Sequence, residues 1–404
     1  MRITFITSSL EPGRDGVGDY TRRLAAECVR QGHASTLLSL NDPQVAAPSS
    51  GSQDSEGTAV EVWRLPSRLS WPDRLARASR CVDLFDPHWI SLQFVPFGFH
   101  PRGFCLGLGG RLARINPQKR WHVMFHELWL GLEQGSPAKF RAWGVLQRLA
   151  TKRLVRRLKP LVCHTQTNPY REALAREGID AALLPLFSNI PRLDGDGWAD
   201  LLEPELARAT GQRAERNSFY LAGVFGAVHP EWNVEQAVAA LLPMIRQSSK
   251  RLGLVFLGKN GLSPTALDNM KSRLRERAVI VQTGERSPSE ISHILQTLDL
   301  GLATTPRQLV QKSSAVAAML AHGVPVLVTR DDWHLAGTKS DLPKLAARLF
   351  TPKQIASLGA LPAKPGEEPA EIRIESVAAR MVTDLNACCL KERALPQTAP
   401  AYGH

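Results

Sequence analysis

The segment "WHVMFHELW" places His126 and Glu127 directly after an apolar run of strand length. Ligands of open parallel sheets bind outside the carboxyl ends of the strands, so a histidine at this position can face a reacting centre. The pair also starts the zinc motif H-E-x-x-H, but Leu130 occupies the place of the second histidine and excludes that motif. Two interpretations of His126 stay open: a group that faces a ligand, or a packed side chain whose hydrogen bonds are satisfied internally.

A glycine-rich loop, "EPGRDGVGDYTRRL", follows the opening strand pattern "MRITFIT". Gly13, Gly16 and Gly18 lie between a predicted strand and a predicted helix, which indicates a backbone that approaches something closely. The dinucleotide fingerprint G-x-G-x-x-G does not fit, because these glycines read G-x-x-G-x-G and begin six residues after the strand pattern ends at Thr7.

Two segments in the second half of the chain predict helix N-termini beside strand ends, which is the geometry of an anion site. In "FGAVHPEWNVEQ", Gly226 ends a strand and a helix begins a few residues later. In "GLATTPRQLVQKSSAVAAML", a polar loop with Arg307 leads to Lys312, and Ser313 or Ser314 can cap the next helix. Backbone N–H groups, a lysine and hydroxyls at one helix start suit a diphosphate. Taken alone, the same pattern also fits an ordinary capped helix with a solvated lysine.

The common catalytic motifs of hydrolases and nucleotidases are absent from the sequence. It contains no phosphate loop G-x-x-x-x-G-K, no nucleophile motif G-x-S-x-G and no cluster with metal-ligand spacing. The "DGDG" segment, from Asp194 to Gly197, resembles an acidic metal-binding pair, but its residues are typical of a turn. We therefore expect that neither a metal ion nor a cofactor is required.

Apolar runs of strand length alternate with helical stretches, which predicts an α/β fold with doubly wound parallel sheets. The first series, from "RITFIT" to "AALLPLF", predicts a Rossmann-like domain over residues 1–190. A polar stretch at 191–216 predicts a linker, and a second series from "SFYLAGVFG" predicts another Rossmann-like domain over 217–363. A closing helix is expected at 374–390 and a flexible tail at 391–404.

The composition is that of a globular protein, with 43% hydrophobic and 22% charged residues in a chain of 404. The formal net charge of +12 favours acidic partners, but only 6% of the residues are aromatic and no base-stacking module is visible, so nucleic acid is not expected. The sequence opens on a strand pattern rather than a secretion signal, and no apolar run approaches the roughly 20 residues of a membrane span. We expect a cytoplasmic protein.

The stretch "RLATKRLVRRLK", from Arg148 to Lys159, combines leucines with a dense set of basic residues at helical spacing. One interpretation is a helix that buries Leu149, Leu154 and Leu158 in the core and leaves its charges in water. The other is an amphipathic helix that contacts anionic lipid at the inner face of the membrane.

Six segments occur in one order along the chain: "GVGDYTRRLA", "FHELW", "HTQTNPYREALAREGI", "PLFSNIP", "FGAVHPEW" and "AMLAHGVPVLVT". Together they resemble glycosyltransferases of the GT-B fold, and most of all the retaining, family-four group that builds bacterial polysaccharides. The resemblance covers nearly all of the chain from Met1 to Arg330. It implies two Rossmann-like domains that face a cleft, with the helix from Ile374 packed back on the first domain.

The resemblance also implies roles for particular residues. Gly16, Gly18 and Asp19 would approach the donor and acceptor, and His126 would hydrogen-bond the transferred sugar near the reacting carbon. The second domain would hold the nucleotide with residues around its base and phosphates, namely Gly226, Gly258, Lys312, Ser313 and Ser314.

The sequence departs from the family pattern where charged groups usually contact the diphosphate, the sugar and the ribose. Trp232 occupies the position of a usual lysine, and Val310 and Ala318 occupy the positions of two usual glutamates. The cationic residues that could restore the lost positive charge are Arg307, Lys312 and Lys259.

Two functions follow from the resemblance and its departures. The first is a glycosyltransferase that moves a hexose from a nucleotide sugar to a glycan or lipid-linked acceptor, with retention, in polysaccharide or glycoconjugate biosynthesis. The second is a catalytically degenerate GT-B protein that serves as a binding or scaffold subunit. The missing charges favour the second function, whereas the glycine loop and His126 favour the first.

Overall fold

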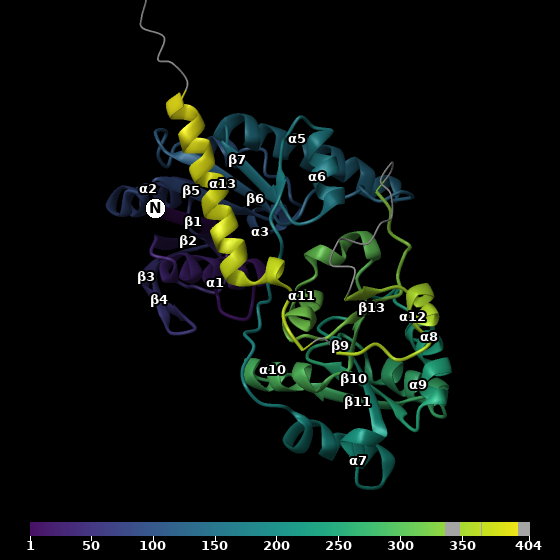
Figure 1. Ribbon diagram of the computed structural model, residues 1–404. Coiled ribbons are helices and arrows are strands. Elements are labelled where there is room, and N and C mark those ends of the chain that lie inside the picture. The colour runs from purple at the N-terminus through teal and green to yellow at the C-terminus, as the bar shows by residue number, and fades with distance from the viewer. Residues whose placement is uncertain (336–347, 365, 395–404) are drawn as a thin grey trace, which may run out of the picture.

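Two parallel β-sheets organise the chain, and each forms the centre of one unit (Figure 1). The computed structural model describes residues 1–335, 348–364 and 366–394. Helices pack on the faces of both sheets, as the crossover connections between parallel strands require. The predicted α/β fold with two doubly wound units is thereby confirmed.

The first sheet has eight strands in the order β3-β4-β2-β1-β5-β6-β7-β8, and its described pairs are parallel except for β3 with β4. Its strands are β1 (Arg2–Thr7), β2 (Ala34–Asp42), β3 (Ser49–Ser55), β4 (Thr58–Pro66), β5 (Trp89–Phe94), β6 (Arg120–Phe125), β7 (Val162–Thr165) and β8 (Ala182–Leu183). All of β5 is buried, because helices cover both faces of the sheet there. The edge strand β3 was missed by the sequence analysis, since "SSGSQDS" has no apolar run.

Six helices belong to the first unit: α1 (Gly16–Arg30), α2 (Trp71–Phe85), α3 (Pro96–Phe99), α4 (Leu108–Leu112), α5 (Ala138–Leu158) and α6 (Asn168–Ala175). Helix α1 begins directly after the glycine-rich loop, because the Asp15 carboxylate accepts hydrogen bonds from the N–H groups of Val17 and Gly18. Its buried face, which includes Leu24 and Cys28, fixes it against the sheet.

In the part of the chain that the structure describes, the second sheet has six parallel strands in the order β11-β10-β9-β12-β13-β14. They are β9 (Phe219–Phe225), β10 (Arg251–Leu257), β11 (Val279–Gly284), β12 (Leu300–Ala303), β13 (Val326–Val328) and β14 (Leu349–Phe350). Among the described residues, the helical segments between β9 and the last helix are α8 (Val234–Gln247), α9 (Pro264–Leu274), α10 (Pro288–Thr297), η3 (Arg307–Lys312), α11 (Ser314–Ala321), α12 (Pro352–Leu358) and η5 (Ala370–Ile372).

The stretch 191–216 differs from the linker that its polar composition predicts. It contains η1 (Trp198–Leu202) and α7 (Glu203–Thr210), and it leads into η2 (Arg216–Ser218). Leu202 and Leu206 are fully buried in the core of the second unit, where Trp198, Leu201 and Ala214 also pack, so the apolar residues of this polar stretch attach it to the second sheet.

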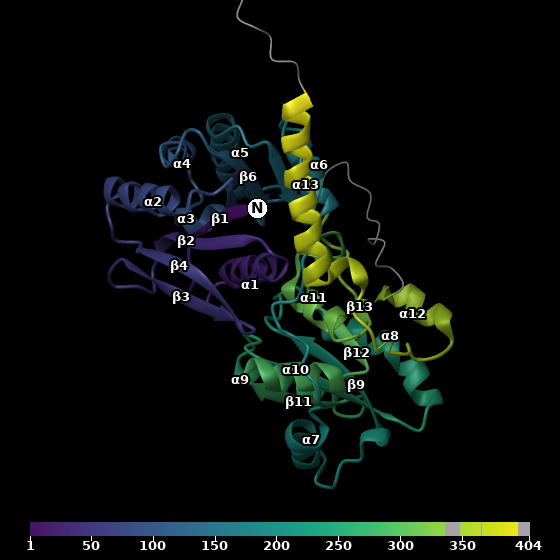
Figure 2. The same cartoon turned by 60° about the vertical axis from the view of Figure 1, so that its left-hand side comes forward.

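The last helix, α13 (Ile374–Ala394), returns from the second unit and lies along the first (Figures 1 and 2). Val377, Met381 and Leu385 are buried against the side of the first sheet that α1 also covers. The helix runs four residues beyond the predicted end at 390, so 391–394 is helical rather than part of a tail. The rest of the predicted tail, 395–404, lies outside the described residues.

Candidate functional site

A cavity lies at the carboxyl edge of the first sheet, where α11 of the second unit meets it. We call it the interdomain cavity, and it is lined by Ser8, Asp15, Gly16, Val17, Val95, Gly98, His126, Glu127, Gln166, Leu186, Asn189, Lys312 and Ser314. Two of these residues come from the second unit and the others from the first. The carboxyl ends of β1, β5, β6 and β7 thus supply most of the wall, which is where ligands bind in open parallel sheets.

A second cavity opens on the other side of the α11 start. It is lined by Phe225, Gly226, Ala227, Leu302, Ala303, Thr304, Thr305, Lys312, Ser313, Ser314, Ala315, Val316 and Met319, and we call it the second-unit cavity. Lys312 and Ser314 line both cavities. A ligand that extended from one cavity into the other would therefore pass this lysine and the N-terminus of α11.

Lys312 is positioned by groups of the first unit. Its Nζ donates a hydrogen bond to the Tyr170 hydroxyl at 2.9 Å and lies 3.9 Å from Glu127 Oε1. Burial lowers the pKa of Lys312, but Tyr170 and the Glu127 carboxylate outweigh burial, and the net shift is upward. Only 23% of the side chain is exposed, so a charged ammonium is held in a largely desolvated place between the cavities.

The N-terminus of α11 adds positive character at the same place. Ser313 is the N-cap and accepts a hydrogen bond from the Val316 N–H at 3.4 Å. A helix start with its partial positive charge, next to a lysine, attracts an anion. This is the arrangement that the sequence predicts for a diphosphate.

His126 lies one residue beyond β6 and only 5% of it is exposed. Its Nε2 is 2.9 Å from Gln93 Oε1, and Gln166 Nε2 is 3.2 Å from its Nδ1. Burial, and to a smaller extent the charge on Lys312, lower the pKa of His126 to about 3. The imidazole is therefore neutral and is held by two amides at the cavity wall. The internal hydrogen bonds of the second interpretation are present, and contact with a ligand stays a prediction.

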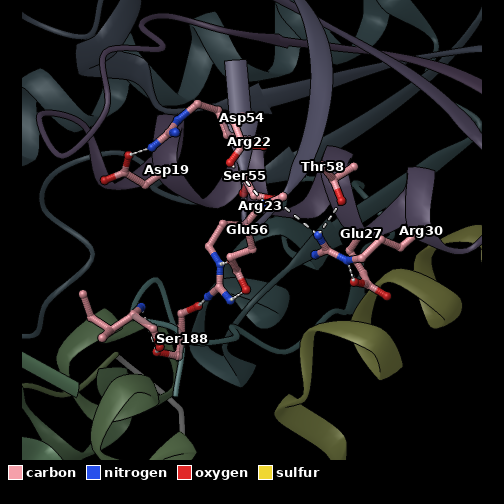
Figure 3. A network of polar contacts seen from close by, with 12 residues as sticks. Asp19, Arg22, Arg23, Glu27, Arg30, Asp54, Ser55, Glu56, Thr58 and Ser188 are labelled. Carbon is pink, nitrogen blue, oxygen red and sulfur yellow. Dashed lines mark hydrogen bonds and ion pairs between the residues drawn. The ribbon is translucent and has the colours of Figure 1, made fainter. Parts of the chain in front are cut away.

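The glycines of the first loop have different roles in the structure. Gly16 lines the interdomain cavity, and a Cβ at Gly16 would meet no atom within 4 Å. A Cβ at Gly18 would lie 2.6 Å from the carbonyl oxygen of Ser9, so that glycine is required by packing inside the protein. Asp19 does not line either cavity: its carboxylate accepts from Gly13 N–H at 3.0 Å and pairs with Arg22 (Figure 3). Asp15, one turn earlier, lines the interdomain cavity, as does Glu127.

Three of the predicted phosphate-side residues lie outside both cavities. Lys259 pairs with Glu285, and both side chains are exposed. Arg307 pairs with Asp331 at 3.1 Å. Gly258 has a left-handed φ of 83° directly after β10, and its N–H donates to the carbonyl oxygen of Gly284, at the end of the neighbouring strand β11, at 3.1 Å.

The positions that lack the family's usual charges are apolar and packed. Val310 and Ala318 are each 1% exposed and belong to the core of the second unit. Trp232 is 7% exposed, and its indole N–H donates to Thr329 Oγ1 at 3.1 Å. Among the three cations that could replace the missing charge, only Lys312 reaches a cavity.

The sequence analysis missed Gln166, which lines the interdomain cavity, and Tyr170, which contacts the cavity residue Lys312. Gln166 follows β7 directly, so the strand-end position that singled out His126 could have found it. Tyr170 lies 142 residues before Lys312, and no local sequence pattern predicts the contact between them. Within the described part of the chain, no group of three histidine, cysteine or acidic side chains could hold a metal ion.

A family model for a glycosyl transferase 4-like domain matches residues 15–218, which is half of the chain. The chain belongs to this family. The match spans the wall of the interdomain cavity that the first unit supplies, except for Ser8. No curated protein matches the sequence of this glycosyltransferase-family chain.

Solved structures similar to this chain share the two-unit architecture over almost its whole length. Trehalose 6-phosphate synthase from Burkholderia multivorans has a TM-score of 0.54 at 11% identity, over 97% of this chain and 99% of its own. HepE from Anabaena, in complex with UDP and glucose, has a TM-score of 0.51 at 15% identity, over 98% and 100%. UDP-GlcNAc 2-epimerase from Methanocaldococcus jannaschii has a TM-score of 0.50 at 10% identity, over 96% and 100%. These similarities establish the GT-B fold.

The helices of the described residues give no candidate for a membrane-crossing segment, because none combines the necessary length with enough hydrophobicity.

Helix α5 differs at one position from the interpretation in which Leu149, Leu154 and Leu158 are all buried in the core. Leu149 is 52% exposed, whereas Leu154 and Leu158 are buried. Leu149 therefore adds to an outward face on which Val145 and Leu146 are also exposed.

Proposed function

We propose that this protein transfers a hexose from a nucleotide sugar to a glycan or lipid-linked acceptor in polysaccharide or glycoconjugate biosynthesis. The observation that carries the proposal is the position of Lys312, charged and desolvated at the N-terminus of α11, where the two cavities meet. The diphosphate would lie at this junction, the nucleoside in the second-unit cavity and the sugar in the interdomain cavity beside His126. HepE, which shares the fold, was solved with UDP and with glucose, and this supports the same class of donor.

The chemistry would break the bond between the anomeric carbon and the phosphate oxygen and form a bond from that carbon to an acceptor hydroxyl. Negative charge develops on the departing diphosphate, and Lys312 together with the α11 N–H groups would stabilise it. Retention would follow if the acceptor attacked from the same face as the leaving phosphate, which would also accept the proton of the acceptor. The protein then supplies mainly orientation and positive charge, without a metal ion.

A scaffold role remains the second candidate, because specific packing favours it. Val310, Ala318 and Trp232 occupy positions where the family usually has charged groups, and all three are buried. The residues that line the second-unit cavity include no carboxylate that could accept the ribose hydroxyls. A protein that kept the fold but lost the donor would have this arrangement.

Peripheral contact with an anionic membrane at its cytoplasmic face is part of the proposal. Exposed apolar side chains on α5, among them Phe140, Leu146 and Leu149, lie on the same helix as the exposed basic residues Arg153 and Arg156. Such a surface suits partial insertion at the lipid headgroups, and it would bring the interdomain cavity near a lipid-linked acceptor.

Calorimetric titration with UDP, GDP and ADP, each with and without magnesium, tests the proposed donor site. We expect saturable binding of one nucleotide that is insensitive to magnesium. Turnover of the corresponding nucleotide glucose, followed as release of the nucleoside diphosphate, should fall strongly in His126→Ala. Absence of binding by all three nucleotides would reject the transferase and favour the scaffold.

A further inference from the structure

A line of buried polar side chains follows one face of β5, β6 and β7, where a core would ordinarily be apolar. Ser91 and Gln93 belong to β5, His122 to β6 and His164 to β7, and His126 continues the line just beyond β6. Residues two apart in a strand point to the same side, so all of these side chains lie on the face that α13 covers. Each is at most 1% exposed except His126, at 5%.

The end of this line at the interdomain cavity consists of three contacts. Gln166 Nε2 is 3.2 Å from His126 Nδ1, and His126 Nε2 is 2.9 Å from Gln93 Oε1. Gln93 Nε2 is 2.7 Å from Ser91 Oγ. Gln166 and His126 line the cavity, whereas Gln93 and Ser91 lie inside the unit.

The far end of the line reaches the last helix of the chain. Ser91 Oγ is 2.8 Å from His122 Nδ1, and His122 Nε2 is 2.9 Å from His164 Nδ1. His164 Nε2 is 3.0 Å from Oδ2 of Asp384, which α13 places at the edge of the sheet. The side chain of Asp384 is 36% exposed, so the line runs from the cavity to the surface under α13.

Asp384 fixes which atom of each contact donates. An ionised carboxylate only accepts hydrogen bonds, so His164 Nε2 must carry a hydrogen, and the neutral ring then accepts at Nδ1. His122 must donate to it from Nε2 and accept at Nδ1, where only the Ser91 hydroxyl can donate. Each neutral imidazole has one donor nitrogen and one acceptor nitrogen. The donor at one end of the line therefore determines the donor in every following contact.

The same logic carries the direction to the cavity. Ser91 donates to His122, so it accepts from the amide NH₂ of Gln93, and the Gln93 carbonyl oxygen accepts from His126 Nε2. His126 Nδ1 accepts from the NH₂ of Gln166. Every contact could also be made with donors and acceptors exchanged, except the last one, where two acceptors would then meet at Asp384. The Asp384 carboxylate thus selects one of the two directions in which the hydrogen bonds of the line can be donated.

We propose that Asp384 is a positioning residue that sets, through this line of hydrogen bonds, which ring nitrogen of His126 carries the proton in the sugar site. The role in the sugar site rests on the proposed function, whereas the protonation of the ring does not. Asp384 belongs to α13, which follows the second unit in the sequence and packs on the first. This helix would therefore contribute to the site as well as to the packing of the first unit.

The electrostatics support neutral rings at His126 and His122 and an ionised carboxylate at Asp384. Burial lowers the pKa of His126 to about 3 and lowers the pKa of His122 well below its usual value. The hydrogen bond from His164 holds the pKa of Asp384 below its usual value. Other charges near the two ends are Arg380, beside Asp384, and Lys312, beside His126.

The direction of the line decides what the cavity wall offers to a sugar. With Nδ1 of His126 as an acceptor, the NH₂ group of Gln166 is turned toward the ring, and the carbonyl oxygen of the same amide is turned away from it. Exchange of donors and acceptors would reverse the Gln166 amide. A hydroxyl that contacts this wall would then find a donor where it now finds an acceptor.

Asp384→Asn tests the proposal with little change of shape, because an amide can either accept from His164 or donate to it. ¹⁵N NMR of histidine-labelled protein, with His126 assigned from its missing signal in His126→Gln, distinguishes a protonated ring nitrogen from an unprotonated one. The wild type should show a proton on Nε2 alone. Asp384→Asn should give a mixture of tautomers or the reverse one. Glu375→Gln, which neutralises an exposed carboxylate on the same helix, should leave the His126 signals unchanged.

Ser91→Ala interrupts the line in the middle and leaves α13 untouched. It should shift the tautomer of His126 as Asp384→Asn does, and adding Asp384→Asn to it should have no further effect. His126 signals that stay at the wild-type tautomer in Asp384→Asn would overturn the proposal. So would an effect of Asp384→Asn that persists in full in the Ser91→Ala background.

Turnover separates this inference from the proposed function. In both variants the rate of sugar transfer or donor hydrolysis should fall by about fivefold, the size of one mispolarised hydrogen bond, with nucleotide affinity unchanged. A tautomer change in a protein that turns over no nucleotide sugar would uphold the hydrogen-bonded line and reject the transferase. Turnover of a nucleotide sugar together with an unchanged His126 tautomer in Asp384→Asn would uphold the transferase and reject the role of the hydrogen-bonded line.

Discussion

The ammonium of Lys312 lies 2.9 Å from the hydroxyl of Tyr170, a residue 142 positions earlier in the chain and on the other unit. The Nζ atom is also 5.0 Å from the centre of the Tyr170 ring. A lysine that donates to a phenol and lies over its ring is held in one orientation, although its flexible stem belongs to another unit. The relative position of the two units therefore fixes where the positive charge is placed.

Lys312→Ala should weaken nucleotide binding by about 10- to 100-fold, because hydrogen bonds between charged groups contribute more than neutral ones and the site is desolvated. Isothermal titration with the nucleotide that binds the wild type measures the change. Because the pKa of Lys312 is raised, the lysine stays charged from pH 6 to pH 9, and wild-type affinity should not fall through loss of its charge in that range.

Lys259→Ala is the matched control for this substitution. Lys259 is exposed and pairs with Glu285 away from both cavities, so its loss should leave affinity within about twofold, as expected for a surface ion pair. Equal losses in the two variants would mean that net charge, rather than the position of Lys312, attracts the nucleotide.

Gly16→Ala and Gly18→Ala should separate binding from folding within one loop. A methyl group at position 18 has no room beside the Ser9 carbonyl oxygen, so Gly18→Ala should lower the free energy of unfolding by roughly 1–3 kcal/mol. A methyl group at position 16 meets no protein atom, so Gly16→Ala should fold with unchanged stability. Urea denaturation measures both effects.

The same pair of variants tests how closely a ligand approaches the loop. If the diphosphate sugar lies against Gly16, Gly16→Ala should reduce nucleotide-sugar affinity although the protein is as stable as the wild type. Wild-type affinity in Gly16→Ala would place the ligand farther from α1.

The fold could be predicted from the sequence because buried parallel strands are nearly continuous apolar runs, and β5, β6 and β9 are of this kind. His126 and Lys312 could be placed for a related reason: each lies next to the end of a recognisable element. Asp19 could not be distinguished from Asp15 in this way, because one turn of helix decides which carboxylate faces the cavity.

The polar line from Ser91 to Asp384 was not predictable for a different reason. Its members come from three strands and from a helix more than two hundred residues later, so only the assembled sheet brings them together. In the sequence, His122 lies inside an apolar run and His164 ends one, and their partners are distant in the chain.

His126 should make stability depend on pH in mildly acidic solution. Its pKa is lowered to about 3 in the folded protein, against an ordinary value near 6.5, so the unfolded chain binds the extra proton between these pH values. Stability therefore falls as the pH falls below 6.5, by about 2 kcal/mol between pH 7 and pH 5 from this residue. Urea denaturation at the two pH values should show a smaller difference in His126→Gln than in the wild type.

His88→Gln provides the comparison, because it replaces an exposed histidine in the same unit. Partial burial also lowers the pKa of His88, so His88→Gln should remove some of the pH dependence, but less than His126→Gln, whose ring is buried. If His126→Gln loses as much stability between pH 7 and pH 5 as the wild type does, His126 is protonated in the folded protein and is not the neutral group that the hydrogen-bonded line requires.

The outer face of α5 should bind anionic vesicles in a salt-dependent manner. Phe140, Leu146 and Leu149 are 42%, 45% and 52% exposed, and the helix also carries exposed Arg153 and Arg156. We expect sedimentation with vesicles that contain phosphatidylserine at low salt and release at high salt, because salt screens the attraction between basic residues and lipid headgroups.

Substitution of Leu146 and Leu149 by Gln should reduce vesicle binding while net charge stays the same, because insertion of apolar side chains adds to the electrostatic attraction. Leu358→Gln removes a side chain of similar exposure, 48%, from the second unit and should not reduce it. If the double substitution on α5 left binding intact at every salt concentration, the attachment would be electrostatic and delocalised over a basic protein surface, and α5 would have no particular role in it.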